Sequence, residues 1–175
     1  MSETEAVNFA QITDVHVGER GLNPREAEWN LRWAINEIAA LEPQPRAIIA
    51  TADLVNAGSR SELEEYSRLV AESAVPIYAL PANHDLWGEK DETAWVELVG
   101  PLRQRVDIGE LAVLLWDDIL RVGGGWKGRL GDEQGRWLEA ELAQCEGRPV
   151  VVAHHAPLLP TGDDFHDVWA GSNGR

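Results

Sequence analysis

The chain has 175 residues, enough for one domain with a substantial core, and its 44% hydrophobic and 26% charged residues exclude a disordered or fibrous class. Its formal net charge of -15, with Lys90 and Lys127 as the only lysines, leaves no basic stripe to follow a phosphate backbone. We therefore expect neither nucleic acid nor an anionic membrane as a partner. The acidic amino terminus lacks a secretory pattern, so we expect a cytoplasmic protein in which residues 1–175 form a single domain.

The first half of the chain alternates predicted strands and helices. Residues 7–12 form an apolar run typical of a buried strand. Asn23 and Pro24 then provide a helix start, and the apolar residues behind them recur at helical spacing. A second strand is predicted at residues 47–50. Ser61 and Glu64 match the capping-box pattern and predict the start of a second helix there.

The second half continues the alternation. Strands are predicted at residues 76–80, 111–116 and 149–153, and a third helix opens at Asp132. The glycine-rich segment 123–128 is predicted to be a loop. Strands that alternate with helices predict an α/β fold with a largely parallel sheet. Several tryptophans lie in apolar or periodic segments, where we predict core packing: Trp29, Trp33, Trp95, Trp116 and Trp137.

Side chains that bind metals follow four of the predicted strands. They are Asp14 and His16 after the first, Asp53 after the second, Asn83 and His84 after the third, and His154 and His155 after the last. In open α/β sheets functional groups converge at the carboxyl ends of the strands. Imidazole, carboxylate and amide oxygen together suit Mn, Fe, Zn or Ni. The sequence therefore predicts a transition-metal site at this end of the sheet.

Each element also has a plain structural interpretation. Asp14 with His16 is compatible with a turn, Asp53 with a helix or turn cap, and Asn83 with an Asx turn. His84 or His155 can be a hydrogen-bonded core histidine. The shared position after the strands, in one order along the chain, favours the metal site over these separate explanations.

That order carries a family resemblance. The segments ITDVHVG, TADLVNAGSRSELEEY, LPANHD, WLEAEL and VVAHHAPL resemble the calcineurin-like metallophosphoesterases, especially class III cyclic-nucleotide phosphodiesterases and glycerophosphodiesterases. The resemblance runs from about Phe9 to Pro160. It implies an α-β-β-α sandwich with two divalent or trivalent transition-metal ions, and hydrolysis of a small phosphate ester through a metal-activated hydroxide.

The resemblance also implies individual roles. Asp14 and His16 would bind the first metal and Asn83 and His154 the second, while Asp53 would bridge the two and His84 would be the catalytic residue beside the substrate phosphate. His155 and Asp85 would support or pack against the site.

The chain departs from the family pattern in two ways. Ala52 and Ala82 stand where the family has glycine, and alanine reaches fewer backbone angles. No closing Gly-His-x-His follows the VVAHHAPL segment, which implies that C-terminal strands are missing, with His166 as a weak substitute. A fragment or non-catalytic remnant that binds metal weakly is therefore the alternative. A nucleotide-binding module ranks below both, because no Gly-x-Gly-x-x-Gly or Walker-type loop follows a strand.

Overall fold

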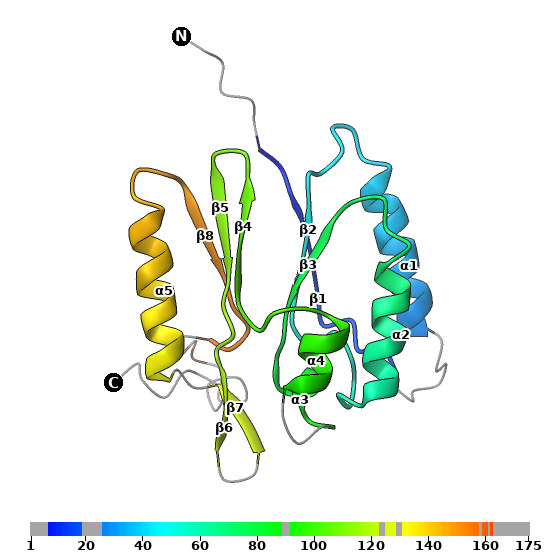
Figure 1. Ribbon diagram of the computed structural model, residues 1–175. Helices are drawn as coiled ribbons and strands as arrows, with labels where there is room; N and C mark the ends of the chain where they lie inside the picture. Colours follow the sequence, from blue (N-terminus) through cyan, green and yellow to red (C-terminus); the bar gives the residue numbers. More distant parts are fainter. Residues whose placement is uncertain are drawn as a thin grey trace.

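The computed structural model describes residues 7–18, 26–88, 92–122, 125–128, 131–157, 159–160 and 162. Two three-stranded sheets face each other, and helices cover the outer face of each (Figure 1). Helix α5 (Asp132–Gln144) lies on one side, and α1 (Glu26–Ala39) and α2 (Arg60–Val70) lie on the other. The four layers confirm the expected α-β-β-α sandwich.

The first sheet is parallel throughout. Its order is β1 (Ala10–Thr13), β2 (Ile48–Thr51) and β3 (Ile77–Leu80). Ala10 pairs with Ile48, and Ile48 pairs with Ile77. All four residues of β2 are buried, because this central strand has a neighbour on each side and packing on both faces.

The start of α2 differs from the prediction. Ser59, not Ser61, is the N-cap: its side chain accepts from the Glu62 backbone N–H, and the Glu62 carboxylate accepts from the Ser59 backbone N–H at 3.0 Å. Both pairs have the same Ser-x-x-Glu spacing, so sequence pattern alone did not separate them. The predicted start of the first helix at Asn23 and Pro24 lies outside the described residues.

The second sheet is mixed, which the sequence did not predict. Its order is β4 (Gln104–Ile108), β5 (Leu111–Leu115) and β8 (Val150–Ala153). β4 runs antiparallel to β5 through a turn at Gly109 (φ +61°), whereas β8 is parallel to β5. The predicted loop at 123–128 was also wrong in part, because β6 (Ile119–Val122) and β7 (Gly125–Gly128) pair as an antiparallel ribbon.

Two short helices, α3 (Asn83–Leu86) and α4 (Thr93–Leu98), follow β3. Trp95 in α4 and Trp116 after β5 are buried, as predicted. Trp29 and Trp33 are instead 63% and 54% exposed and stack on each other along the outer surface of α1. Their spacing places both tryptophans on one face of the helix, but a different face, which carries the buried Leu31 and Ile35, packs against the sheet. No described helix is long and apolar enough to span a bilayer.

Candidate metal centre

β1, β2, β3 and β8 end at the same end of the sandwich, and the loops that follow them carry the predicted ligands (Figure 1). The loops after β1 and β2 stay hydrogen-bonded beyond the strands. Asp14 N–H donates to the Ala52 carbonyl (3.2 Å) and His16 N–H donates to the Asp53 carbonyl (3.0 Å). This continued parallel pairing holds the Asp14–His16 loop directly beside Asp53.

Asp14, His16 and Asp53 form a candidate metal-binding cluster. One ligand atom from each lies within 4.8 Å of the others. Ligands of one transition-metal ion lie within about 4 Å of one another, so a small side-chain movement would close the cluster around an ion. The buried Nδ1 of His16 has no hydrogen-bond partner in the described structure. Two carboxylates and an unpartnered imidazole nitrogen fit a divalent cation.

The backbone around this cluster is strained. Within the described ranges, the non-glycine residues with positive φ are Asp14 (+52°), His16 (+51°), Ala52 (+72°) and Asp53 (+49°). This conformation is unfavourable for L-residues with a Cβ atom, and such strain concentrates at functional sites. The expected strain at Ala52 is therefore present. Ala82 is extended, with φ -127°, so alanine there is unstrained.

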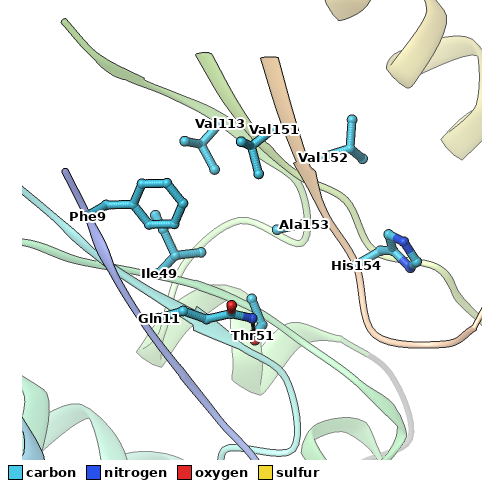
Figure 2. A pocket seen from close by; sticks show the side chains of 9 residues that line it. All are labelled: Phe9, Gln11, Ile49, Thr51, Val113, Val151, Val152, Ala153 and His154. Carbon is cyan, nitrogen blue, oxygen red and sulfur yellow. Dashed lines mark hydrogen bonds between the residues drawn. The ribbon is translucent and has the colours of Figure 1, made fainter. Parts of the chain in front are cut away.

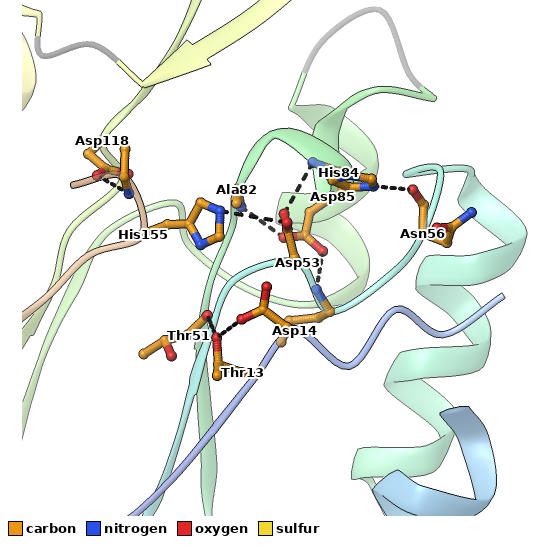
Figure 3. A network of polar contacts seen from close by, with 12 residues as sticks. Thr13, Asp14, Thr51, Asp53, Asn56, Ala82, His84, Asp85, Asp118 and His155 are labelled. Carbon is orange, nitrogen blue, oxygen red and sulfur yellow. Dashed lines mark hydrogen bonds and ion pairs between the residues drawn. The ribbon is translucent and has the colours of Figure 1, made fainter. Parts of the chain in front are cut away.

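Asp85 braces the loops that carry Asp53 and Asn83. Its carboxylate, 1% exposed, accepts backbone N–H groups from Leu54 (2.8 Å), Val55 (3.0 Å) and Ala82 (2.8 Å) (Figure 3). Burial raises the pKa of Asp85 to about 7, against the opposing effect of these three donors. All three of these hydrogen bonds come from backbone of the site loops, so Asp85 supports the site. Asn83 is buried at the first position of α3.

His84 has a fixed ring orientation. Its Nδ1 lies 2.6 Å from the Asn56 carbonyl oxygen, which can only accept, so Nδ1 donates (Figure 3). The ring also packs against Trp87, with centroids 3.9 Å apart, and meets the edge of His16 at 4.8 Å. The His84 backbone nitrogen lies 3.4 Å from Asp53 Oδ1. These contacts place the ring beside the cluster with Nε2 available for a ligand.

The structure brings His155, and not His154, to Asp53. His155 Nε2 lies 3.6 Å from Asp53 Oδ2, and Figure 3 shows the two side chains pointing toward each other. Strand alternation explains this: Val151 and Ala153 pack on the core between the sheets, so His155, two residues further, faces the same way. This two-residue alternation along the strand can be read from the sequence, and it is the signal that could have predicted the direction of His155.

The side chain of His154 is turned toward Asp118, in the loop after β5. Its Nδ1 lies 3.0 Å from the Ala156 carbonyl oxygen and 3.4 Å from Asp118 Oδ2. The hydrogen bond to the Asp118 carboxylate raises the pKa of His154. The resemblance gave His154 the ligand role and His155 a supporting one; in this structure His155 lies beside Asp53 and His154 lies beside Asp118.

Two buried aspartates after β5 were missed by sequence reasoning. Asp118 is 2% exposed and accepts the Ala156 N–H at 2.6 Å. Asp117 pairs with Arg103 (3.2 Å) and accepts from Gln134 Nε2 (3.2 Å). Burial raises the pKa of Asp117 to about 6. The available signal was their position, since they follow the predicted strand at 111–116 as the ligands follow the others.

A cavity of about 180 Å³ lies between the sheets and extends to His154 (Figure 2). Its lining comes from β1, β2, β5 and β8 and their flanking residues: Phe9, Gln11, Ile49, Thr51, Val113, Val151, Val152, Ala153 and His154. Six of these nine residues are apolar, and the polar ones are Gln11, Thr51 and His154. His166, the suggested substitute ligand, lies outside the described residues.

Comparison with known proteins identifies the family of this chain. The family model described as calcineurin-like phosphoesterase matches residues 7–173. The chain belongs to this family. Among solved structures, a purple acid phosphatase from yellow lupin seeds matches with a TM-score of 0.64 and 17% identity, covering 91% of this chain and 32% of that one. At that identity the match shows the fold alone, the metallophosphoesterase sandwich.

Curated calcineurin-like relatives are named as phosphodiesterases. The glycerophosphodiester phosphodiesterase GpdQ of Enterobacter lignolyticus is 28% identical, covering 81% of this chain and 52% of that protein. A probable GpdQ of Arcobacter nitrofigilis is 27% identical (94% and 62% covered). The 3',5'-cyclic adenosine monophosphate phosphodiesterase CpdA of Escherichia coli is 31% identical (92% and 59% covered). The chain thus spans between 52% and 62% of these relatives' lengths.

Proposed function

We propose that this protein hydrolyses a small phosphate ester at a bimetal centre. The observation that carries the proposal is the convergence of Asp14, His16 and Asp53 on a strained backbone within 4.8 Å. Asp14 and His16 would hold one ion, Asp53 would bridge, and Asn83 with a histidine from the β8 loop would hold the second. Mn, Fe, Zn and Ni suit this set of ligand atoms.

The ions would polarise a phosphoryl oxygen and make a nearby water more acidic. The chain's own contribution is to orient the groups around them. His84, held through Nδ1 by the Asn56 carbonyl, presents Nε2 to the substrate and, when protonated, can donate a proton to the leaving oxygen. Asp85 keeps the loops of Asp53 and Asn83 together.

We assign the β8 ligand to His155, because its Nε2 lies 3.6 Å from Asp53 while His154 is turned toward Asp118. His155→Ala should therefore weaken Zn²⁺ binding more than His154→Ala. The two variants are matched in chemistry and position, and isothermal titration of each with Zn²⁺ measures the difference. A larger loss in His154→Ala would return the ligand role to His154.

Small phosphodiesters, such as cyclic nucleotides or glycerophosphodiesters, are the proposed substrates, because the relatives carry those names. The net charge of -15 disfavours a polynucleotide substrate. A cytoplasmic location is part of the same proposal.

The alternative is a protein that holds metal weakly without hydrolysis. One observation favours this alternative. In the described part of the chain, the His, Cys, Asp and Glu residues that lie close enough together to hold a metal ion form a single group of three, which is enough for one metal site and not for two. Elemental analysis after dialysis against Mn²⁺, with hydrolysis of bis(p-nitrophenyl) phosphate, separates the two. Two ions per chain with turnover supports the enzyme, one ion without turnover supports the alternative, and no bound metal refutes both.

Three variants make that experiment specific. Asp53→Asn should release both ions, and Asp14→Asn mainly one, because an amide is a poor bridge between cations. His84→Ala should keep its metal and lose roughly 10²–10⁴ in rate. Asp107→Asn, on the half-exposed surface of β4, is the matched control and should leave metal content unchanged.

A further inference from the structure

We propose that Thr13 is a positioning residue for Asp14: its hydroxyl holds one oxygen of the Asp14 carboxylate, so that the other oxygen is directed to the metal site. The inference rests on the proposed function, because it takes Asp14 as a metal ligand. It adds an uncharged residue, the last of β1, to the machinery of the site.

The first support is the hydrogen bond between the two side chains. Thr13 Oγ1 donates to Asp14 Oδ2 at 2.5 Å, a length typical of a charge-assisted bond from a hydroxyl to a carboxylate. Figure 3 shows this bond, and it shows the second oxygen of the carboxylate on the side of Asp53. A carboxylate held through one oxygen presents the other to an ion. Hydrogen bonds of this kind commonly orient the ligands of protein metal sites.

The second support is the backbone at Asp14. In an extended strand, successive side chains point to opposite faces of the sheet. Asp14 leaves β1 with φ +52°, and this left-handed turn lets its carboxylate meet the hydroxyl of Thr13. Backbone angles alone leave the side-chain torsions of Asp14 free. The hydrogen bond to Thr13 restricts these torsions, so backbone and hydroxyl together set the direction of the carboxylate.

The third support is the anchoring of Thr13 itself. Thr13 pairs with Thr51 at the end of the β1–β2 ladder, and its Oγ1 also lies 2.7 Å from the Thr51 carbonyl oxygen. A hydroxyl has one proton to donate, and the charged carboxylate of Asp14 is the stronger acceptor. Threonine is branched at Cβ, which restricts its first side-chain torsion. The hydroxyl is therefore held at a fixed place between β1 and β2.

The side chain of Thr51 provides a matched control. Its hydroxyl accepts from Gln11 Nε2 at 2.8 Å and lies 3.3 Å from the Ile12 carbonyl oxygen. Both partners precede Thr13 in β1 and lie away from the Asp14 carboxylate. Thr51→Val therefore removes a hydroxyl from the same pair of strand ends, while the Thr51 carbonyl and the contact between Thr13 and Asp14 remain.

The test measures Zn²⁺ affinity by isothermal titration and the visible absorption of the Co²⁺-loaded chain, which depends on ligand geometry. Thr13→Val keeps the shape of the side chain and removes the donor. Outer groups that orient metal ligands contribute 10–100-fold to affinity, and here water competes because both side chains are exposed. We expect a loss at the lower end, about 10-fold, with shifted Co²⁺ bands. Thr13→Ser restores the donor and should recover most of the affinity, whereas Thr51→Val should change neither readout.

A double-mutant cycle separates positioning from general damage to the fold. Thr13→Val combined with Asp14→Ala should bind Zn²⁺ no more weakly than Asp14→Ala alone, because Thr13 acts through Asp14. Additive losses, or no recovery in Thr13→Ser, would overturn the inference. If Asp14→Ala weakens binding and Thr13→Val does not, the positioning role alone fails. If Asp14→Ala binds like the wild type, or the wild type binds no Zn²⁺, the proposed function fails and this inference with it. Should Thr13→Val not fold, unchanged affinity in Thr13→Ala overturns the positioning role.

Discussion

Left-handed backbone at Ala52 is the most local feature of the candidate site. Ala52 (φ +72°) leads into Asp53, the proposed bridging ligand, and its carbonyl accepts the Asp14 N–H. The free energy that this conformation costs is offset by the parallel pairing around it. Alanine at this position therefore trades stability for the geometry that presents Asp53.

Replacing Ala52 by glycine should be more favourable than replacing Ala82 by glycine. Both alanines are fully buried, so each variant loses one buried methyl group. Each variant also gives the unfolded chain the same additional conformational freedom. Only Ala52 is left-handed, a strain worth roughly 1–2 kcal/mol, whereas Ala82 has φ -127°. Urea unfolding should give Ala52→Gly a free energy of unfolding about 1–2 kcal/mol above that of Ala82→Gly. Equal values would mean that Ala52 is unstrained.

Asp117 should make folding stability depend on pH. Burial raises the pKa of its carboxyl from 3.8 to about 6, so between these values the folded chain holds a proton that the unfolded chain has lost. Stability from this group therefore increases as the pH falls through 6. The Asp117→Asn variant has no such titrating group. The free energy of unfolding of the wild type, relative to that of the variant, should therefore increase by about 1–3 kcal/mol from neutral pH to pH near 4. Urea unfolding of both proteins across this range measures the gain; a difference that stays constant or reverses contradicts it.

At the scale of elements, α3 is held by direct backbone contact with the loop before α2. A Cβ at Gly58 would lie 2.6 Å from the His84 carbonyl oxygen, and a Cβ at Gly88 would lie 2.6 Å from the Gly58 carbonyl carbon. Two backbones touch here because neither glycine has a side chain. This contact brings the Asn56 carbonyl to the ring of His84.

Gly58→Ala should therefore disturb both stability and the site. The new methyl meets backbone, which cannot rotate away, and φ is +66° at this position. Overpacking and left-handed strain together predict a loss of about 2–4 kcal/mol in urea unfolding. The His84 ring signals in ¹⁵N NMR should shift as the Asn56 contact lengthens. Wild-type stability with unchanged signals would show that the two segments separate easily.

Gly135 in α5 provides the opposite case. A Cβ there meets no atom within 4 Å, and the residue lies inside a helix. Gly135→Ala should raise the free energy of unfolding by about 0.5–1 kcal/mol, because alanine has the better helix propensity. Thermal unfolding measures the gain, and a loss would indicate that α5 is packed more tightly than the structure shows.

At the scale of the molecule, a cavity opens between the two sheets beside β1 and β8. In the described structure each of these strands has a single sheet partner, β2 and β5 respectively. Apolar side chains such as Phe9 and Val151 line the opening. An unpaired edge beside apolar surface favours association, whereas the net charge of -15 opposes it.

Self-association should therefore increase with salt. Added NaCl screens the repulsion between acidic surfaces and leaves apolar contacts intact. Sedimentation velocity at low and high NaCl should show the average mass rising with ionic strength. A monomer under both conditions, or association that salt reverses, would show that the opening is not a contact surface.

Sequence alone determined five of the strands, β1, β2, β3, β5 and β8, and the kind of residues that follow them. Period-two and period-3.6 patterns are local, and so is the position of Asp14, His16 and Asp53 directly after apolar runs. Parallel strands bring such ends together in any α/β sheet, so the cluster of these three residues followed from the pattern. Family motifs over nearly the whole chain gave the sandwich.

Tertiary structure decided which partner each group meets. Three contacts illustrate this: His155 lies beside Asp53, Asp118 accepts the Ala156 N–H, and Asp85 accepts three backbone N–H groups. The residues in these contacts are from 3 to 102 positions apart in the sequence. The antiparallel β4, the exposed Trp29 and the choice of Ser59 as cap are of the same kind. A local pattern fixes the period of an element and the residue types at its ends. Which face is buried, and which donor meets which acceptor, is settled only when distant elements pack and each buried polar group finds its partner.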